Sequence, residues 1–567
     1  MAEEDMEAED KLVDEDHLAR DGGINFSEDE LEEIDIDVHP DEPDLKEPNC
    51  LLQPKLCLVF VQCYFITIAC ILGTGILGLP VTLAESGFSP FLVSFFFCFI
   101  MQILLVYFFV DLLQRAHAYH IDKYRSAASL DDAPLPMSEV RQDGHTGLPN
   151  GSVHSYIQEI SKVVPKPNLH TLGVLFLPRG LGAAFNILVL LNLISILISY
   201  ALAGSEAYAQ ILGINFIYII PVFVWVQALA IVFAQKFIHP VVSILTFFKG
   251  SVLVATVIVT FGVGSTVANV VTNDFAYFGT PFLMGTVALG GVFLVMPMMY
   301  AKVQYCQIQM KYFFYSITAG VATCAILNIL WCWAVLQIVP QLSSCVLPSQ
   351  MGQTNDSYDQ SVTTLPSKSL SPDAAVCSQD YSLQRAAENG EIATVPLTEI
   401  LAEDHPEFKW VAILIQVFII ISVTVSYLTL GSALKHSFLG WLDDLMSWGR
   451  HLTDERPSVT SRLRLLPRNV FRPILTLLLF GAIFGVAMAN PKGFVTMLDK
   501  IASLLINLLA GLFVFLMVRK SRSATYRNLQ IPYPVTDYLF PLHILLPIFF
   551  LFAVGYDIII SIIDFFH

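Results

Sequence analysis

The apolar stretch at residues 56–79 constrains the fold of this chain more than any other feature. As a helix it is long enough to cross a hydrocarbon core of about 30 Å. Its second half nevertheless carries Gly73, Gly75 and Gly78 and is followed by Pro80. Glycine weakens a helix and proline ends one, so backbone N–H and C=O groups become free inside the membrane. Broken helices of this kind hold substrate in many secondary transporters. Small residues that allow close helix packing explain the same pattern equally well.

Composition places the chain among multi-pass membrane proteins. Of its 567 residues, 55% are hydrophobic and only 14% are charged, which excludes a large soluble enzyme. The apolar runs predict an all-α polytopic membrane protein with about 11 transmembrane helices. We expect spans near residues 56–79, 88–113, 181–204, 215–235, 243–268, 282–303, 312–339, 410–434, 471–489, 498–518 and 538–563.

Lysine and arginine are distributed unequally between the loops. If the N-terminus is cytosolic, most of them fall in cytosolic loops, and the outer loops hold only Lys368, Arg385, Lys409 and Lys492, with Lys500 at a span edge. The positive-inside rule therefore predicts a cytosolic N-terminus and an extracellular or luminal C-terminus. Within a transporter domain of residues 56–563, residues 114–180 become a cytosolic insert and residues 340–409 an extracellular or luminal loop.

The outer loop carries two features of an oxidising, secretory environment. Asn355 begins an Asn-Asp-Ser acceptor for N-glycosylation. Cys345 and Cys377 lie in the same loop. A disulfide between them is favoured over two free thiols, because the lumen is oxidising.

Residues 1–55 form an acidic tail. Its first fifty residues hold 21 acidic residues against three basic ones, whereas the rest of the chain is balanced in charge. A segment of this kind cannot bury a core, so we expect a disordered cytosolic tail that repels nucleic acid and suits a cytosolic partner. Glu47 and the Leu51-Leu52 pair resemble an endosomal and lysosomal sorting signal. The plasma membrane and the endosomal or lysosomal membrane both remain open as locations.

A second interrupted span follows five spans after the first. Residues 281–297 carry Gly290-Gly291 in mid-span and Pro297 downstream. A pair of interrupted helices in corresponding positions of two halves is the best sequence sign of a transport site. The recurrence favours a site between spans one and six over simple packing through small residues.

Polar side chains follow one face of two further spans. In the third span, Asn192, Ser195 and Ser199 recur at helical spacing, beside Tyr200. In the eighth span, Ser426 and Thr429 share a face, and hydroxyl oxygens suit a hard monovalent coupling ion. Hydrogen bonding between helices accounts for these hydroxyls equally well.

The sequence contains no recognisable enzyme constellation. It has no phosphate-binding Gly-rich loop with a following lysine, no His/Cys metal spacing and no nucleophile elbow. We therefore expect no enzyme activity, no catalytic residues, no metal site and no cofactor. Transport would instead use a coupling ion, either a proton or sodium.

Several of these motifs resemble the amino acid/auxin permease family of the amino acid–polyamine–organocation superfamily. Residues 73–80 (GTGILGLP) are similar to its first helix. Residues 199–204 (SYALAG) and 426–428 (SYL) resemble the third and eighth helices of the hydroxy and aromatic amino acid permeases, and residues 490–494 (NPKGF) also fit their pattern. The resemblance implies a 5+5 inverted-repeat transporter fold with broken helices 1 and 6, and symport of neutral amino acids with a proton or sodium. Val425 departs from the threonine that many sodium-coupled relatives carry before the serine, which argues against a conventional sodium site.

Together these features predict a symporter of neutral amino acids, aromatic ones included, that sits among membrane lipid. Backbone N–H groups of Gly73, Thr74 and Gly75 would hold the substrate carboxylate, and Tyr200 would close over it. The amino group would be held by carbonyls of Ala288, Leu289, Gly290 and Gly291. The alternative is an amino-acid-sensing receptor or transceptor with little flux, which the long acidic tail suits. A third reading is a structural membrane protein with a decayed site.

Overall fold

The computed structural model describes residues 54–130, 164–267, 269–342, 381–403, 406–451, 468–489 and 497–566. Within these residues all regular elements are helical, and 11 helices are long and apolar enough to cross a membrane. The predicted all-α polytopic fold is therefore confirmed. The spans are α1 (Pro54–Gly78), α3 (Phe88–Leu130), α6 (Arg179–Leu212), α7 (Phe216–Phe233), α8 (Gln235–Val267), α9 (Gly279–Gly290) with α10 (Val292–Tyr300), α11 (Gln307–Ile338), α14 (Lys409–His451), α16 (Arg468–Ala489), the series η5 (Met497–Ala502), α18 (Ser503–Leu508), η6 (Leu509–Val514) and α19 (Phe515–Lys520), and α21 (Leu545–Phe566).

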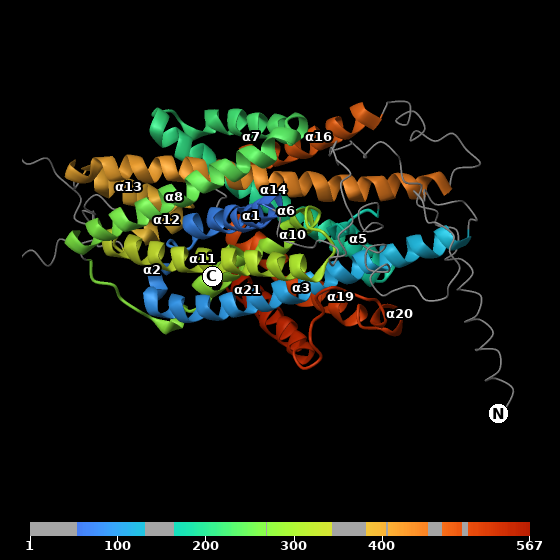
Figure 1. The fold of residues 1–567 in the computed structure, drawn as a ribbon. Helices are drawn as coiled ribbons and strands as arrows, with labels where there is room; N and C mark the ends of the chain where they lie inside the picture. Colours follow the sequence, from blue (N-terminus) through green and yellow to red (C-terminus); the bar gives the residue numbers. More distant parts are fainter. Residues whose placement is uncertain are drawn as a thin grey trace, which may run out of the picture.

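The helices lie side by side in one elongated bundle, with α1 in its middle (Figure 1). α1 contacts α8, α9, α10, α11 and α14, so it is surrounded by partners from both halves of the chain. The α9–α10 span is the most enclosed, with 94% of its apolar window buried, against 22% for the spans that contain α16 and α21. Spans one and six therefore form the centre of the bundle, and α16 and α21 lie at its lipid-facing edge.

Span six is interrupted in mid-span, whereas the first span is one continuous helix that ends later in the chain than its glycines suggest. α1 remains helical through Gly73 and Gly75 and ends at Gly78, before a turn at residues 79–82 and the short helix α2 (Leu83–Ser86). Pro80 accounts for this end, because proline has no N–H to continue the helix. In span six the interruption is the single residue Gly291, which keeps φ −65° and ψ −12° between α9 and α10.

Span ten is built with two π-helical turns, η5 and η6, on either side of α18. Turns of this kind are frequent at functional sites in helices. Asn507 of α18 is fully buried, and its Nδ2 donates to Thr286 Oγ1 of α9 at 2.8 Å. A buried polar contact therefore connects span ten to the interrupted span six.

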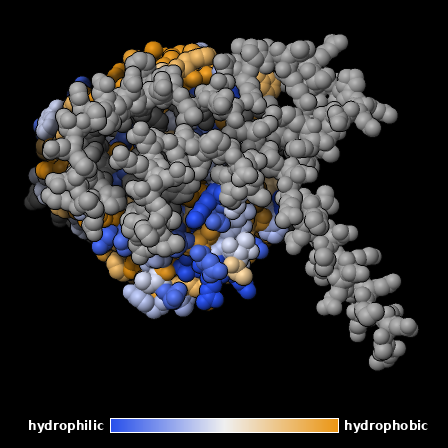
Figure 2. All heavy atoms as spheres, turned by 45° about the vertical axis from the view of Figure 1, so that its right-hand side comes forward, coloured by the Kyte–Doolittle hydropathy of each residue, from blue (hydrophilic) through white to orange (hydrophobic). Residues whose placement is uncertain are grey.

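The connecting segments gather at two opposite ends of the bundle. At one end, which also carries α2, α12 (Leu383–Asn389) and α13 (Thr394–Glu403), Gln341 Nε2 donates to Leu83 O at 3.1 Å and to Thr272 O at 3.2 Å. At the other end, Lys166 Nζ donates to Ala301 O at 2.8 Å and to Val303 O at 2.7 Å. Burial lowers the pKa of Lys166 to about 8. This second end carries α5 (Leu169–Phe176) and α20 (Ala524–Arg527), and Figure 2 shows hydrophilic residues gathered there beside hydrophobic flanks.

A buried ion pair holds the second end together. Asp111 Oδ2 of α3 accepts a hydrogen bond from Arg115 Nε at 2.8 Å, and both side chains are buried. Its Oδ1 accepts from the backbone N of Val535 at 3.0 Å and lies 3.8 Å from Arg522 Nη2. One carboxylate thus links α3 to the segment between α19 and α21.

We expect Asp111→Asn to destabilise the protein by about 3–5 kcal/mol, because it leaves the buried Arg115 guanidinium without its counter-charge. The thermal unfolding of purified protein in detergent measures this. The control is Asp537→Asn, because Asp537 also approaches Arg522, at 3.6 Å, but is fully exposed. An Asp111→Asn melting temperature equal to that of Asp537→Asn would contradict the structural role.

Candidate substrate and coupling site

A lysine lies fully buried where α1, α8 and α14 meet. Lys249 Nζ of α8 donates to Ser426 Oγ of α14 at 3.0 Å, to Ala69 O of α1 at 3.3 Å and to Ser422 O of α14 at 3.4 Å. Its exposed fraction is 0%. None of the ion pairs found among the described residues involves Lys249. Neutral oxygens from two neighbouring helices therefore hold this ammonium group.

The oxygens around Lys249 are of the kind that bind a monovalent cation. Backbone carbonyl and hydroxyl oxygens are hard ligands, and Ser426 Oγ also donates to Ala69 O at 2.6 Å. An ionisable group deep within a membrane span is costly and marks a functional site. The Lys249 amine thus bonds Ser426, one of the two residues predicted to bind a coupling ion.

The two predicted coupling-ion ligands have different surroundings. Ser426 bonds both Lys249 and α1, as described above. Thr429 Oγ1 instead donates to Val425 O of its own helix at 2.8 Å. The structure brings Ser426 to the junction, whereas the Thr429 hydroxyl is used within α14.

Gly73 and Tyr200 meet across α1 and α6. A methyl group added at Gly73 would collide with the Tyr200 hydroxyl and lie 2.6 Å from Ser426 Oγ. Tyr200 is fully buried. Only glycine allows this approach, so Tyr200 covers Gly73 in the structure. The predicted proximity of Tyr200 to the first helix is present, although the backbone of Gly73, Thr74 and Gly75 keeps its helical hydrogen bonding.

Gly75 faces a different partner, on α11. A methyl group there would lie 2.5 Å from Asn328 Oδ1. One turn further along α11, Trp331 Nε1 donates to Ile76 O at 3.0 Å. Gly75 therefore serves the close packing of α1 against α11.

The span-six residues predicted to bind substrate are buried or partly buried but face in different directions. A methyl group at Gly291 would lie 3.3 Å from Cys70 Sγ of α1, whereas one at Gly290 would lie 2.9 Å from Ile506 Cδ1 of span ten. Ala288 and Leu289 are fully enclosed. Gly291 is thus brought to α1, one helical turn before Gly73, while Gly290 packs away from it.

Two buried polar atoms on helices that contact α1 have no hydrogen-bond partner among the described residues. They are Asn328 Oδ1 in α11 and Ser422 Oγ in α14. Buried polar groups are normally satisfied by protein, water or ligand. The helices that border α1 therefore offer unused donors and acceptors, as a site for a small polar molecule requires.

Lys249 and Asn328 are the site residues that sequence reasoning missed. The signal for Lys249 was present, because it is the single charged residue in the apolar run at 243–268 and such a residue marks function. Asn328 gave no comparable signal, since its importance depends on how α11 is rotated against α1.

Further predictions concern a metal site, the outer loop and the acidic tail. No group of three or more His, Cys, Asp or Glu residues that could hold a metal occurs in the part of the chain that the structure describes. The acceptor Asn355, the cysteines Cys345 and Cys377, and tail residues 1–53 lie outside the described residues.

No protein-family profile and no curated protein matches this chain. Similar solved structures include a mutant of the Eremococcus coleocola manganese transporter, at 10% identity over 90% of this chain and 87% of that chain, with a TM-score of 0.49. The same transporter in complex with an aromatic bis-isothiourea substituted compound matches at 10% identity over 89% and 87% of the two chains, with a TM-score of 0.47. Likeness of this degree carries no argument about function, which therefore rests on the residues of this chain.

Proposed function

We propose that this protein is a secondary active transporter of neutral amino acids, coupled to protons rather than to sodium. The observation that carries the proposal is the Lys249 ammonium, held by Ser426 Oγ and Ala69 O at the junction of α1, α8 and α14. The Lys249 amine at this place excludes a sodium ion from the same oxygens by its volume and, while protonated, also by its charge. Val425 before Ser426 agrees with the absence of a conventional sodium site.

Protonation of Lys249 would control the position of α1. In its charged form the amine makes hydrogen bonds to α1 and α14 that are about twice as strong as those of a neutral donor. Loss of the proton weakens this link and releases α1 from α8 and α14. Alternate access of Lys249 to the two sides then couples proton movement to the opening of the site.

The substrate would bind between Gly73 and Gly291, where Tyr200 now closes the space. The described side chains nearest these glycines are those of Tyr200, Ser426 and Cys70, and none of them carries a charge. The side chains in contact are neutral, and the Lys249 ammonium behind Ser426 is already bonded to Ser426 Oγ and Ala69 O, so the site suits a zwitterion with a neutral side chain. Gly73 and Gly75 lower the cost of bending α1 by about 1 kcal/mol each relative to alanine, so movement of Tyr200 can expose backbone groups for the carboxylate. The preference for aromatic amino acids rests on the family resemblance alone.

Uptake into proteoliposomes tests this function. A panel of labelled amino acids, offered to purified full-length protein, should show saturable uptake of neutral members and none of lysine or glutamate. Empty liposomes are the control. Saturable binding without uptake would favour the alternative of an amino-acid-sensing receptor, and absence of both would contradict the proposal.

A further inference from the structure

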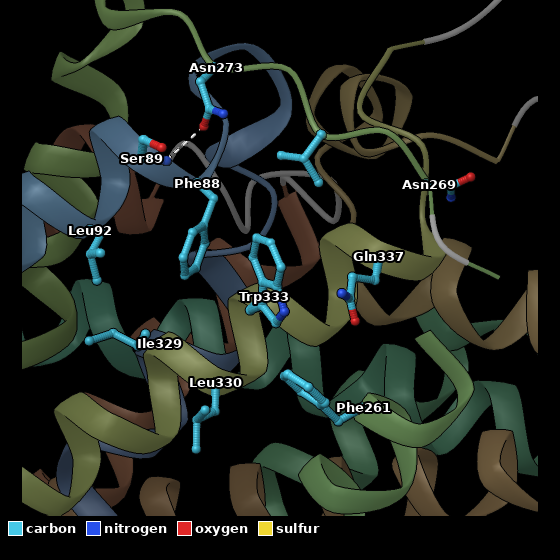
Figure 3. Close-up of a pocket in the computed structure, with 11 residues that line it drawn as sticks. Phe88, Ser89, Leu92, Phe261, Asn269, Asn273, Ile329, Leu330, Trp333 and Gln337 are labelled. Atoms are coloured by element: carbon cyan, nitrogen blue, oxygen red, sulfur yellow. Dashed lines mark hydrogen bonds between the residues drawn. The ribbon is translucent and has the colours of Figure 1, made fainter. Parts of the chain in front are cut away.

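A groove of about 740 Å³ opens on the bundle, lined by residues other than those of the candidate substrate site (Figure 3). It lies between the start of α3, the last turns of α8 and α11, and the segment 269–273. This is the end of the bundle that carries α2. Three of its lining side chains, Leu92, Phe261 and Leu330, lie in candidate spans and are 40%, 38% and 38% exposed. The groove therefore opens towards lipid.

The interior of the groove is aromatic. The rings of Phe88 and Trp333 lie at its centre, with centroids 4.6 Å apart and planes inclined by 58° (Figure 3). Leu330 and Ile329 continue this surface along α11. A rigid, flat hydrocarbon matches such a wall better than a mobile acyl chain, because less conformational entropy is lost when it binds.

One edge of the groove is polar but carries no charge. Asn273 Oδ1 accepts from the Ser89 backbone N at 2.7 Å, and Asn269 Nδ2 donates to Ile338 O at 2.7 Å, so both amides serve the protein itself. None of the groove's lining residues is basic or acidic. A phosphate head group would find no cation here, whereas lipid phosphates are usually bound by Lys and Arg.

Gln337 has hydrogen-bonding capacity that the described residues do not use. Its Oε1 is buried against α8, where a methyl group on Gly264 would lie 2.8 Å from it, so Nε2 is the carboxamide atom left for a ligand in the groove. In Figure 3 the carboxamide lies between Trp333 and Phe261, at the border between the polar edge and the apolar interior. A hydroxyl both donates and accepts, so it satisfies a carboxamide in either orientation.

We propose that this groove binds a sterol. The ring system would lie against Phe88 and Trp333, and the single hydroxyl would bond Gln337 at the level where the spans end. The cavity lies within the range of about 300–1,000 Å³ that is usual for ligands of this size. The inference rests on the lining of the groove and is independent of the proposed amino acid transport.

Photolabelling with a diazirine analogue of cholesterol tests the site. The full-length protein in liposomes should be labelled within residues 88–92 and 329–337, and excess cholesterol should compete. Trp333→Ala should lower the labelling about tenfold, because it removes the central ring. Gln337→Leu, which keeps the side-chain size, should lower it about fivefold through the lost hydrogen bond. Trp410→Ala is the matched control, since Trp410 is 56% exposed on α14 and does not line the groove.

Three results would overturn the proposal. The first is labelling spread evenly over lipid-facing helices. The second is unchanged labelling in Gln337→Leu, a variant that removes no packing volume. The third is equal labelling of residues 329–337 by a photoreactive phosphatidylcholine that cholesterol does not displace, which would make the groove a phospholipid site.

Discussion

Lys249→Met should abolish proton-driven uptake and leave a folded protein. Methionine fills a similar volume but carries no proton and no charge, so the link between α8, α1 and α14 is lost. Removing a buried, unpaired charge relieves its desolvation cost, which offsets the hydrogen bonds that Lys249 no longer donates. We therefore expect uptake at the level of empty liposomes together with an unchanged or raised melting temperature.

Two further variants make this result specific. Lys249→Arg keeps the charge but does not release its proton, so substrate should bind and exchange without being driven by a pH gradient. Lys435→Met makes the same chemical change at a lysine on a different helix, α14. There Lys435 Nζ donates to Ile231 O and Val232 O at 3.3 Å each. Lys435→Met should retain proton-driven uptake. Retained proton-driven uptake in Lys249→Met would remove the basis for proton coupling at this site.

Gly73→Val should abolish substrate binding. The structure leaves no room for a β-carbon at Gly73, because the Tyr200 hydroxyl lies in its path and Ser426 Oγ is 2.6 Å away. The added side chain would also fill the space that opens when Tyr200 moves. We expect substrate to produce no rise in the melting temperature of the variant. Separately, the variant itself should be less stable by about 1–3 kcal/mol, the usual cost of overpacking a core.

The control for Gly73→Val is Gly485→Val. Gly485 also lies within a spanning helix, α16, but a methyl group there meets nothing within 4 Å. Both variants carry the same change in helix propensity, because valine replaces glycine within a helix in each, so a difference in ligand binding reports the site. Ligand stabilisation of Gly73→Val equal to that of Gly485→Val would place the substrate elsewhere.

The fold was predictable because a membrane restricts it severely. Eleven apolar runs predicted eleven spans, and the structure contains them with ends that differ by several residues, as at Gln307–Ile338 against the expected 312–339. The sequence analysis placed Tyr200 over a substrate held by the first span, and the structure has Tyr200 against Gly73. The contact of Ser426 with α1 was not predicted.

The detailed geometry of the site was less predictable, for two physical reasons. The glycines of α1 weaken its helix, but α1 packs closely against α11, with Trp331 Nε1 bonded to Ile76 O, and it stays helical until Gly78, just before Pro80. The rotation of each helix about its own axis decides that Gly291 faces Cys70 while Gly290 faces Ile506. This rotation follows from packing among all the spans, which a single sequence pattern does not specify.

Uptake of a neutral amino acid into proteoliposomes under two separate gradients is the most direct test of proton coupling through Lys249. A proton gradient without sodium should drive accumulation, and a sodium gradient at equal pH on both sides should not. The same vesicles with Lys249→Met should show neither. Sodium-driven accumulation by the wild-type protein, undiminished without a pH gradient, would contradict the assignment of Lys249 as the built-in cation of this transporter.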